Sequence, residues 1–442
     1  MPQESIVRAV LDCYPLEVSD VSLIQRRTRR TFWTVATDQG EMILRQTRVD
    51  SPRMLFIAAA QLYLEQRGLA ISRLHLTKEG GACVSVAPHS YVLFERLKGQ
   101  PLNYFDREHL KQAMQFMAGF HVASEGYSAP NESKSRRRVG KWHRLYRWRI
   151  QELEGYRLLA ANHPDDPFSA AFKEHADFMI DNANQALTAI NGPGYEDWTN
   201  ECAERGTFCQ QDFTLARLVS RADFASMREL RSINKDLPAR DMRIFINKVM
   251  KKLSVWDSNL AADMLHWYQE ANALDEPKWR ILWADLQFPH LFYSTVHKYY
   301  LNLRPIWSLE KHLQALKNVI SVEQTKTDFI NHFDETYAYI NGALPMDQNA
   351  FKDVQQPQVT ITVVRPEKPE SLGLESAKPE MEGAKDIDPG GSDQIDSVDL
   401  TGFRFETPAP EKGPAGSERQ RPISRKRRRR QEKRTRGRRK GR

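Results

Sequence analysis

The sequence predicts an α+β fold in which a small antiparallel β lobe precedes a large helical lobe. Residues 16–97 contain β-branched and aromatic runs separated by turn signals, which is typical of short strands. Beyond residue 98 the apolar positions recur at three- and four-residue spacing, as in residues 106–124, which indicates amphipathic helices. We therefore predict an N-terminal β-rich lobe over residues 1–97 and a helical lobe over residues 98–350.

The first lobe is expected to contain five strands and one helix. Ser51 and Pro52 favour a helix start, because Ser suits the cap position and Pro suits the first turn, and Gly68 marks the helix end. The strands are expected over residues 21–25, 31–37, 41–46, 74–77 and 91–95. We expect them to form one antiparallel sheet, with residues 97–99 as the connection to the helical lobe.

The second lobe is expected to be helical with one β-like interruption over residues 206–231. The helices are expected over residues 106–124, 141–161, 170–190, 239–252, 259–273, 276–285, 288–303 and 308–319.

The composition changes sharply near residue 354, where Pro, Glu, Gly, Ser and Asp begin to dominate. Chain of such low hydrophobicity cannot bury enough apolar surface to offset the entropy of ordering. Residues 354–418 are therefore predicted to be a disordered acidic segment with net charge −7, and residues 419–442 a disordered basic tail with net charge +14. Because the whole chain carries a formal charge of +8, residues 1–353 are almost neutral.

The basic tail has no aromatic residues between its Lys and Arg residues, so stacking on bases is not indicated. Its charge suits phosphate contacts with nucleic acid and equally suits other polyanions. We favour polyanionic partners for residues 419–442 over nucleic acid.

The lack of recognisable targeting signals and the cysteine usage predict synthesis in the cytoplasm without a membrane partner. The N-terminus lacks a basic region followed by an apolar stretch, and no run of about 18 apolar residues occurs. The four cysteines show no zinc-type spacing and are expected to be buried thiols in a reducing compartment. They are Cys13, Cys83, Cys202 and Cys209.

Residues 208–219 resemble the catalytic loop of small-molecule kinases. In that loop an Asp accepts the proton of the attacking hydroxyl, and a later Asn holds a magnesium ion. This chain retains the Asp as Asp212, but Gln210 stands where a His is usual and Arg217 stands where the Asn is usual. A guanidinium cannot ligate a cation, so Arg217 either repels the metal or replaces its charge. Asp212 can equally be a structural residue that caps the loop.

Arg45 and Gln61 are candidates for the contact to the nucleotide phosphates. Arg45 occupies the strand position where such kinases carry Lys, although Arg is not a neutral replacement for Lys. Gln61 lies where the following helix would supply a carboxylate to that cation. Gln cannot form an ion pair, so if Gln61 is the equivalent of that carboxylate, Arg45 is expected to lack a charged partner. The alternatives are an exposed strand Arg and a solvated helix Gln.

Glu229 and Asp241 complete the set of candidate residues. Glu229 has the spacing of the second magnesium ligand, whereas Asp223 follows Arg217 too closely for a strand, a turn and a returning strand. A solvated strand residue is the alternative for Glu229. In kinase-like folds an Asp at the position of Asp241 bonds back to the catalytic-loop backbone, and an ordinary helix N-terminal charge is the alternative.

These motifs together resemble the CotS-type spore coat proteins of endospore-forming bacteria, which are relatives of the aminoglycoside phosphotransferases. The resemblance covers about residues 5–345. Its motifs are residues 91–99, 119–127, 140–142, 209–219, 236–241, 288–290 and 299–300. The resemblance implies a bilobal protein-kinase-like fold and a role in assembly of the spore coat, on the mother-cell side.

The departures from the phosphotransferase pattern fall on the chemistry, at Arg45, Gln61, Gln210 and Arg217. We therefore predict a catalytically degenerate protein that acts by binding other spore coat proteins. No cofactor is expected, and at most one residue, Glu229, is expected to be a metal ligand. Two alternatives stay open. One is an active phosphotransferase that uses ATP and magnesium on a small molecule or coat component, with Asp212 as base. The other is a protein that binds nucleic acid or other polyanions through residues 419–442.

Overall fold

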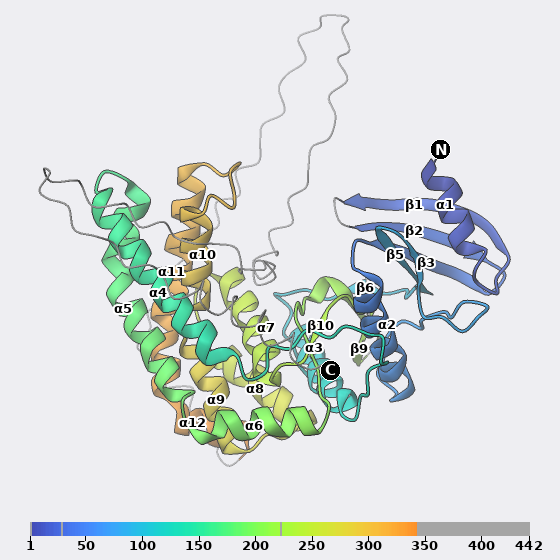
Figure 1. The fold of residues 1–442 in the computed structure, drawn as a ribbon. Coiled ribbons are helices and arrows are strands. Elements are labelled where there is room, and N and C mark those ends of the chain that lie inside the picture. The colour runs from blue at the N-terminus through green and yellow to red at the C-terminus, as the bar shows by residue number, and fades with distance from the viewer. Residues whose placement is uncertain (1, 28–29, 222, 343–442) are drawn as a thin grey trace, which may run out of the picture. The chain divides into compact units, whose positions relative to one another are not determined.

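The computed structural model describes residues 2–27, 30–221 and 223–342. The segments predicted to be disordered, residues 354–418 and 419–442, lie outside this part. The described chain forms the predicted α+β fold, with a sheet lobe followed by a helical lobe (Figure 1). Within the described ranges, no helix has both the length and the apolar character of a membrane span.

The first lobe is built on the predicted five-stranded antiparallel sheet, with strand order β1, β2, β3, β5, β4. The strands are β1 (Val18–Arg27), β2 (Arg30–Thr37), β3 (Gly40–Thr47), β4 (Val84–Val86) and β5 (His89–Glu95). The central strands are in continuous register, since Trp33 of β2 lies opposite Leu44 of β3, which in turn lies opposite Leu93 of β5.

The strand predicted over residues 74–77 is wrong. Leu74 makes one isolated bridge to Phe94, and the amide of His75 donates to the carbonyl of Leu93 at 2.9 Å. The chain then turns through Gly80, so no ladder forms. The fourth strand is β4 instead, which pairs with β5 as the other arm of a hairpin.

Each face of the sheet is covered by a helix. Successive strand side chains point to opposite faces, and Leu93 packs in a core with Val10 of α1 (Pro2–Leu11). Its neighbour Val92 belongs to the larger core, which includes α2 (Ser51–Gln66). The sequence analysis predicted α2 but not α1.

The cap of α2 is Asp50 and not Ser51. The Asp50 carboxylate accepts a hydrogen bond from the Arg53 amide at 3.1 Å, and Pro52 follows in the first turn.

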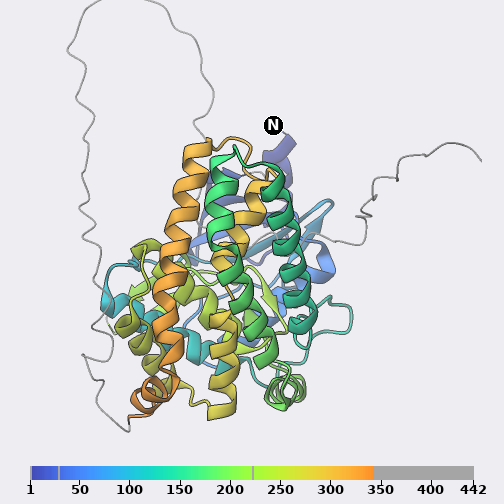
Figure 2. The same cartoon turned by 90° about the vertical axis from the view of Figure 1, so that its left-hand side faces the viewer.

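The second lobe consists of helices around one large apolar core. They are α3 (Arg107–Ser124), α4 (Trp142–Asn162), α5 (Pro167–Ala189), α6 (Pro193–Glu204), α7 (Pro238–Leu253), α8 (Ser258–Ala271), α9 (Glu276–Gln287), α10 (His290–Tyr300), α11 (Leu309–Asn331) and α12 (Phe333–Ile340). The helices α4, α5, α10 and α11 run side by side (Figures 1 and 2). Helices α6 and α12 were not predicted, and α11 continues well beyond its predicted end at residue 319.

Short strands interrupt the helices and position the motif of residues 208–219. They are β6 (Gln100–Pro101), β7 (Cys209–Gln210), β8 (Leu218–Arg221), β9 (Phe224–Met227) and β10 (Ile233–Asn234). Strand β7 pairs with β10, and β8 forms a hairpin with β9, so the loop after Gln210 is held between two paired elements.

The end of β9 lies against the first lobe. The Met227 amide donates to the Ala70 carbonyl, and the Ser72 amide donates to the Met227 carbonyl, both at 2.8 Å.

The predicted burial of the cysteines holds for Cys202 and Cys209. Cys83 is partly buried and Cys13 is exposed, contrary to the prediction. Cys13 follows the end of α1, which was not predicted, and therefore lies outside the core. All four thiols are free.

Candidate active site

Both oxygens of the Asp212 carboxylate are bonded to cations. Asp212 follows β7 and precedes the 3-10 turn Leu215–Arg217. Its Oδ2 lies 2.5 Å from Nη2 of Arg217, and its Oδ1 lies 3.1 Å from Nζ of Lys248 on α7. Lys248 also donates to the Phe213 carbonyl at 2.8 Å, which ties the loop to α7.

The charges around Asp212 keep its carboxylate ionised. Burial would raise its pKa, but Arg217 and Lys248 outweigh burial and lower the pKa to about 2. Asp212 can accept hydrogen bonds in this state, but both of its oxygens already have a cationic donor.

Arg45 is buried and has a charged partner, so the prediction that it lacks one is wrong. Its Nη1 lies 3.0 Å from Oε2 of Glu229 and 3.0 Å from the carbonyl oxygen of Leu230. Arg45 comes from β3 and Glu229 follows β9, so the pair links the sheet lobe to the inserted strands of the helical lobe. The side chains of Arg45 and Glu229 are 4% and 3% exposed, which excludes a solvated role for either.

Gln61 lies in the buried face of α2, and its side chain forms hydrogen bonds with backbone groups. Its Nε2 donates to the Ser72 carbonyl at 2.8 Å, and its Oε1 accepts from the Leu230 amide at 3.1 Å. The side chain is 2% exposed, so the alternative of a solvated Gln is excluded. Gln61 thus fixes the segment that carries Glu229, and Glu229 itself provides the carboxylate for Arg45.

Glu229 has a second cation, since Arg231 Nε donates to its other oxygen. Burial would raise the pKa of Glu229, but Arg231 and Arg45 outweigh burial and lower it. Asp223, which also resembled a metal ligand, lies in the turn of the β8–β9 hairpin.

The residues present do not fit the magnesium ion that a kinase-like fold implies. Magnesium requires free oxygen ligands in near-octahedral arrangement. Arg217 and Lys248 occupy the oxygens of Asp212, and Arg45 and Arg231 occupy those of Glu229. A metal at either carboxylate would have to share an oxygen with a cation that already contacts it, against charge repulsion, or displace that cation.

Asp241 connects α7 to the loop through the backbone. Its Oδ2 accepts a hydrogen bond from the Gln210 amide and lies 3.3 Å from Nε2 of His121 on α3. The Gln210 side chain points elsewhere, with its Nε2 2.9 Å from Sδ of Met227. Asp241 is fully buried, which excludes an ordinary exposed helix charge.

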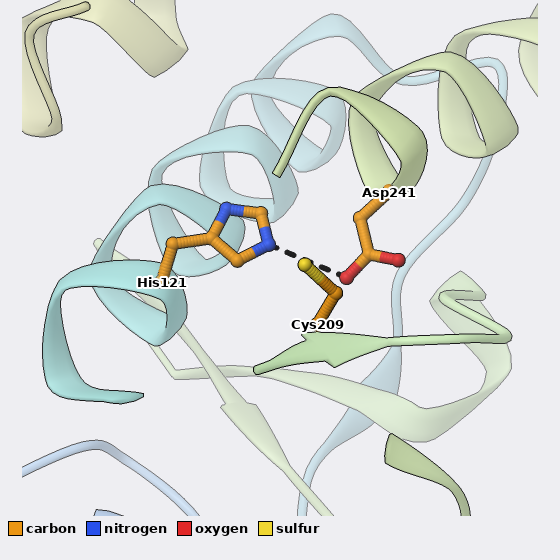
Figure 3. Close-up of side chains that lie close together, drawn as sticks. All are labelled: His121, Cys209 and Asp241. Atoms are coloured by element: carbon orange, nitrogen blue, oxygen red, sulfur yellow. Dashed lines mark hydrogen bonds and ion pairs between the residues drawn. The ribbon is translucent and has the colours of Figure 1, made fainter. Parts of the chain in front are cut away.

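His121, Cys209 and Asp241 converge in the interior, with ligand atoms within 4.8 Å of one another (Figure 3). Each of these side chains already has a protein partner. His121 Nδ1 lies 2.8 Å from the Tyr268 hydroxyl, and the Cys209 thiol donates to the Asp236 carbonyl at 3.0 Å. Burial also raises the pKa of Cys209, which disfavours the thiolate that a metal needs. The cluster is thus explained as a hydrogen-bonded support for the loop.

A cleft of about 570 Å³ lies beside Glu229, between the sheet and the connection to the helical lobe. Its apolar lining comes mainly from strands β1, β2, β3 and β5. Its cationic lining comes from the connection and from the segment after β9, as Arg96, Lys98, Arg228 and Arg231, and its carboxylates are Glu41 of β3, Glu95 of β5 and Glu229.

Sequence reasoning missed Lys248, Arg231 and His121. Arg231 lies two positions after Glu229, and its side chain would lie on the same side of an extended chain, which was an available signal. Lys248 and His121 gave no signal, because their contacts with Asp212 and Asp241 depend on how α7 and α3 pack.

A five-stranded antiparallel sheet with a helix on each face, joined to a helical lobe that carries an inserted hairpin and an Asp-containing loop, defines a protein of the kinase-like class. A solved structure supports this fold. An aminoglycoside phosphotransferase from Alicyclobacillus acidocaldarius superposes with a TM-score of 0.63 at 17% identity, over 75% of this chain and 96% of that one.

Sequence comparison then gives the family. The chain belongs to the family described as "Spore coat putative kinase YutH", whose model matches residues 14–333. It is 45% identical to spore coat protein S of Bacillus subtilis (strain 168) over 338 residues, which cover 76% of this chain and 96% of that protein. It is also 24% identical to the endospore coat-associated protein YutH of the same strain, over 55% of this chain and 68% of that protein.

Proposed function

We propose that this protein is a component of the spore coat that acts by binding and does not catalyse metal-dependent phosphoryl transfer. The observation that carries the proposal is that cations pair with both the candidate base, Asp212, and the candidate metal ligand, Glu229. Asp212 is held by Arg217 and Lys248, and Glu229 is held by Arg45 and Arg231. Phosphoryl transfer depends on a positioned base and on neutralisation of phosphate charge by metal ions. Here the base is engaged in ion pairs and no carboxylate is free for a metal.

The names of the similar proteins support a place in the coat. Spore coat protein S and the coat-associated protein YutH are both spore coat proteins by name. We assign this chain to the same structure, after synthesis in the mother-cell cytoplasm, with other coat proteins as partners. The basic tail of residues 419–442 is a second binding element, suited to polyanions by its charge.

A phosphotransferase assay tests the proposal. The full chain is incubated with labelled ATP, magnesium and either coat extract or aminoglycosides as acceptors. We expect no transfer above the level of the Asp212→Asn variant. Magnesium-dependent transfer that this substitution abolishes would overturn the proposal, because it would require Asp212 to act as a base despite its ion pairs.

A further inference from the structure

We propose that the cleft beside Glu229 binds a phosphate-bearing anion without a divalent cation, with fixed arginine and lysine charges in place of the metal. The inference rests on the proposed function and deepens it, because it assigns a ligand class to a site that does not fit magnesium.

Four cations line the cleft, namely Arg96, Lys98, Arg228 and Arg231, against the three carboxylates of Glu41, Glu95 and Glu229. Further cations lie around Glu229 and Asp212. Asp212 and Glu229 interact electrostatically with Arg30, Arg45, Arg217, Arg231 and Lys248, and Arg228 interacts with Glu229. The cations also act on one another. Burial, with Arg231 and Arg30 adding to its effect against Asp212 and Glu229, lowers the pKa of Arg217 to about 10. A bound anion would relieve this repulsion.

Several guanidinium nitrogens at the site are buried without a hydrogen-bond partner among the described residues. They are Nε of Arg45, Nε and Nη1 of Arg217, and Nε of Arg228. The Arg217 side chain is 4% exposed, so these donors are removed from bulk water. A buried donor without an acceptor costs about 1–3 kcal/mol. Of these residues Arg228 lines the cleft, so an anion bound there would supply an acceptor for its Nε.

The cleft has the size and lining for such a ligand. Its volume of about 570 Å³ lies in the range of roughly 300–1,000 Å³ that small-molecule sites show. Ile24, Ile43 and Phe94 provide apolar walls for an organic group. Arg228 and Arg231 line the same cleft and provide charge for a phosphate.

Arg231 is the cation best placed to meet the ligand. Its guanidinium lies over the Phe32 ring, 5.4 Å from the ring centroid, and one of its nitrogens is bonded to Glu229. Its side chain is 29% exposed, whereas that of Arg45 is 4% exposed. Arg231 can therefore offer its remaining N–H groups to a ligand without leaving Glu229.

The test is a calorimetric titration of the full chain with ADP. It is carried out once in buffer with EDTA and once in buffer with magnesium. We expect binding in EDTA that magnesium does not strengthen. We expect Arg231→Gln to weaken binding by about tenfold, as for the loss of one charge-assisted hydrogen bond. The matched control is Arg157→Gln on α4, an Arg that pairs with Glu154 and Asp177 away from the cleft, and it should bind like the unmodified chain.

Two outcomes would overturn the inference. One is ADP binding that appears only with magnesium, or no binding at all. The other is binding in EDTA that Arg231→Gln leaves unchanged, because that ligand would then be held elsewhere, for example by residues 419–442. A second variant, Arg217→Asn, removes the buried cation and restores an amide oxygen, so it should also weaken binding in EDTA. Arg231→Gln decides the matter if Arg217→Asn fails to fold.

The inference and the proposed function fail separately. Absence of ADP binding in EDTA, together with absence of phosphoryl transfer, overturns the inference alone. Magnesium-dependent transfer overturns the proposed function, whatever the calorimetry shows in EDTA.

Discussion

The Arg45 guanidinium lies 3.0 Å from the Glu229 carboxylate, although the two residues are 184 positions apart in the chain. In an active kinase-like site, the corresponding cation contacts phosphate and the corresponding carboxylate contacts magnesium. In this protein the two groups neutralise each other. The pair is buried on both sides, and Arg45 gains a further acceptor in the Leu230 carbonyl.

Removing one partner of this pair should destabilise the protein more than removing both. Glu229→Met leaves Arg45 buried without an opposite charge, which costs about 3–5 kcal/mol. The double variant Arg45→Met with Glu229→Met replaces the pair by apolar side chains and should recover part of that loss. Urea unfolding of the unmodified, single and double variants measures the difference. A double variant no more stable than Glu229→Met would contradict the expectation.

The Asp241 carboxylate should contribute to stability through the loop backbone. Asp241→Ala leaves the buried Gln210 amide without its acceptor and His121 without its neighbour, so we expect a loss of about 1–3 kcal/mol or more. The control is Asp334→Ala, since the side chain of Asp334 is 88% exposed and its removal should change little. Equal unfolding midpoints for the two variants would show that the Asp241 contacts do not stabilise the fold.

His290 should make the folded state sensitive to acid. Its Nδ1 lies 2.9 Å from Nη1 of Arg149, which can only donate, so Nδ1 accepts and Nε2 carries the proton toward Asp285 at 2.8 Å. Burial, with Arg243 adding to its effect, lowers the pKa of His290 from 6.5 to about 3. Between these values the unfolded chain binds more protons than the folded chain. Stability should therefore fall as the pH drops from 6.5 toward 3.

The variant His290→Gln isolates this effect. It removes the titrating group, so the slope of unfolding free energy against pH should decrease by up to about 1.4 kcal/mol per pH unit in that window. His163→Gln, at an exposed position, should leave the slope as it is. Unfolding in urea at several pH values gives both slopes, and an unchanged slope in His290→Gln would show that His290 is protonated in the folded protein.

Two glycines should respond in opposite directions to substitution by alanine. Gly206 has a φ of +67°, and a Cβ there would lie 3.0 Å from the Tyr127 carbonyl oxygen. Gly206→Ala should cost about 1–2 kcal/mol or more, because left-handed backbone and close contact both oppose it. Gly155 lies inside α4 with open space around its Cα, so Gly155→Ala should stabilise by about 0.5–1 kcal/mol. Thermal unfolding measures the change in stability of both variants. A Gly206→Ala variant more stable than the unmodified chain would show that position 206 is not strained by a side chain.

The sequence predicted elements with a strong period and missed those with a weak one. The strand over residues 31–37 and the helix over residues 106–124 have clear apolar periods and were found. Helix α1 was missed because only Val7, Val10 and Leu11 mark its buried face. The predicted strand over residues 74–77 was wrong because Leu74 makes one bridge to β5 without a ladder, and Leu76 is exposed.

The sequence predicted which residues belong to the candidate site, but it did not predict which of them contact one another. Asp212, Glu229 and Arg45 were selected from spacing within a known pattern. Their contacts could not be read from spacing, because each partner comes from a distant part of the chain. Arg45 reaches Glu229 only once β3 and the segment after β9 pack together, and Lys248 reaches Asp212 only through the position of α7.

The position of the Arg45–Glu229 pair has a consequence for motion. Enzymes that act on substrates between two lobes commonly open and close around a hinge. Here such an opening would separate β3 from the segment after β9 and break a buried ion pair, together with the backbone hydrogen bonds of Met227 to Ala70 and Ser72. These contacts oppose an opening of the two lobes. The protein would enter an assembly as a building block of fixed shape, which suits a material that must keep its dimensions.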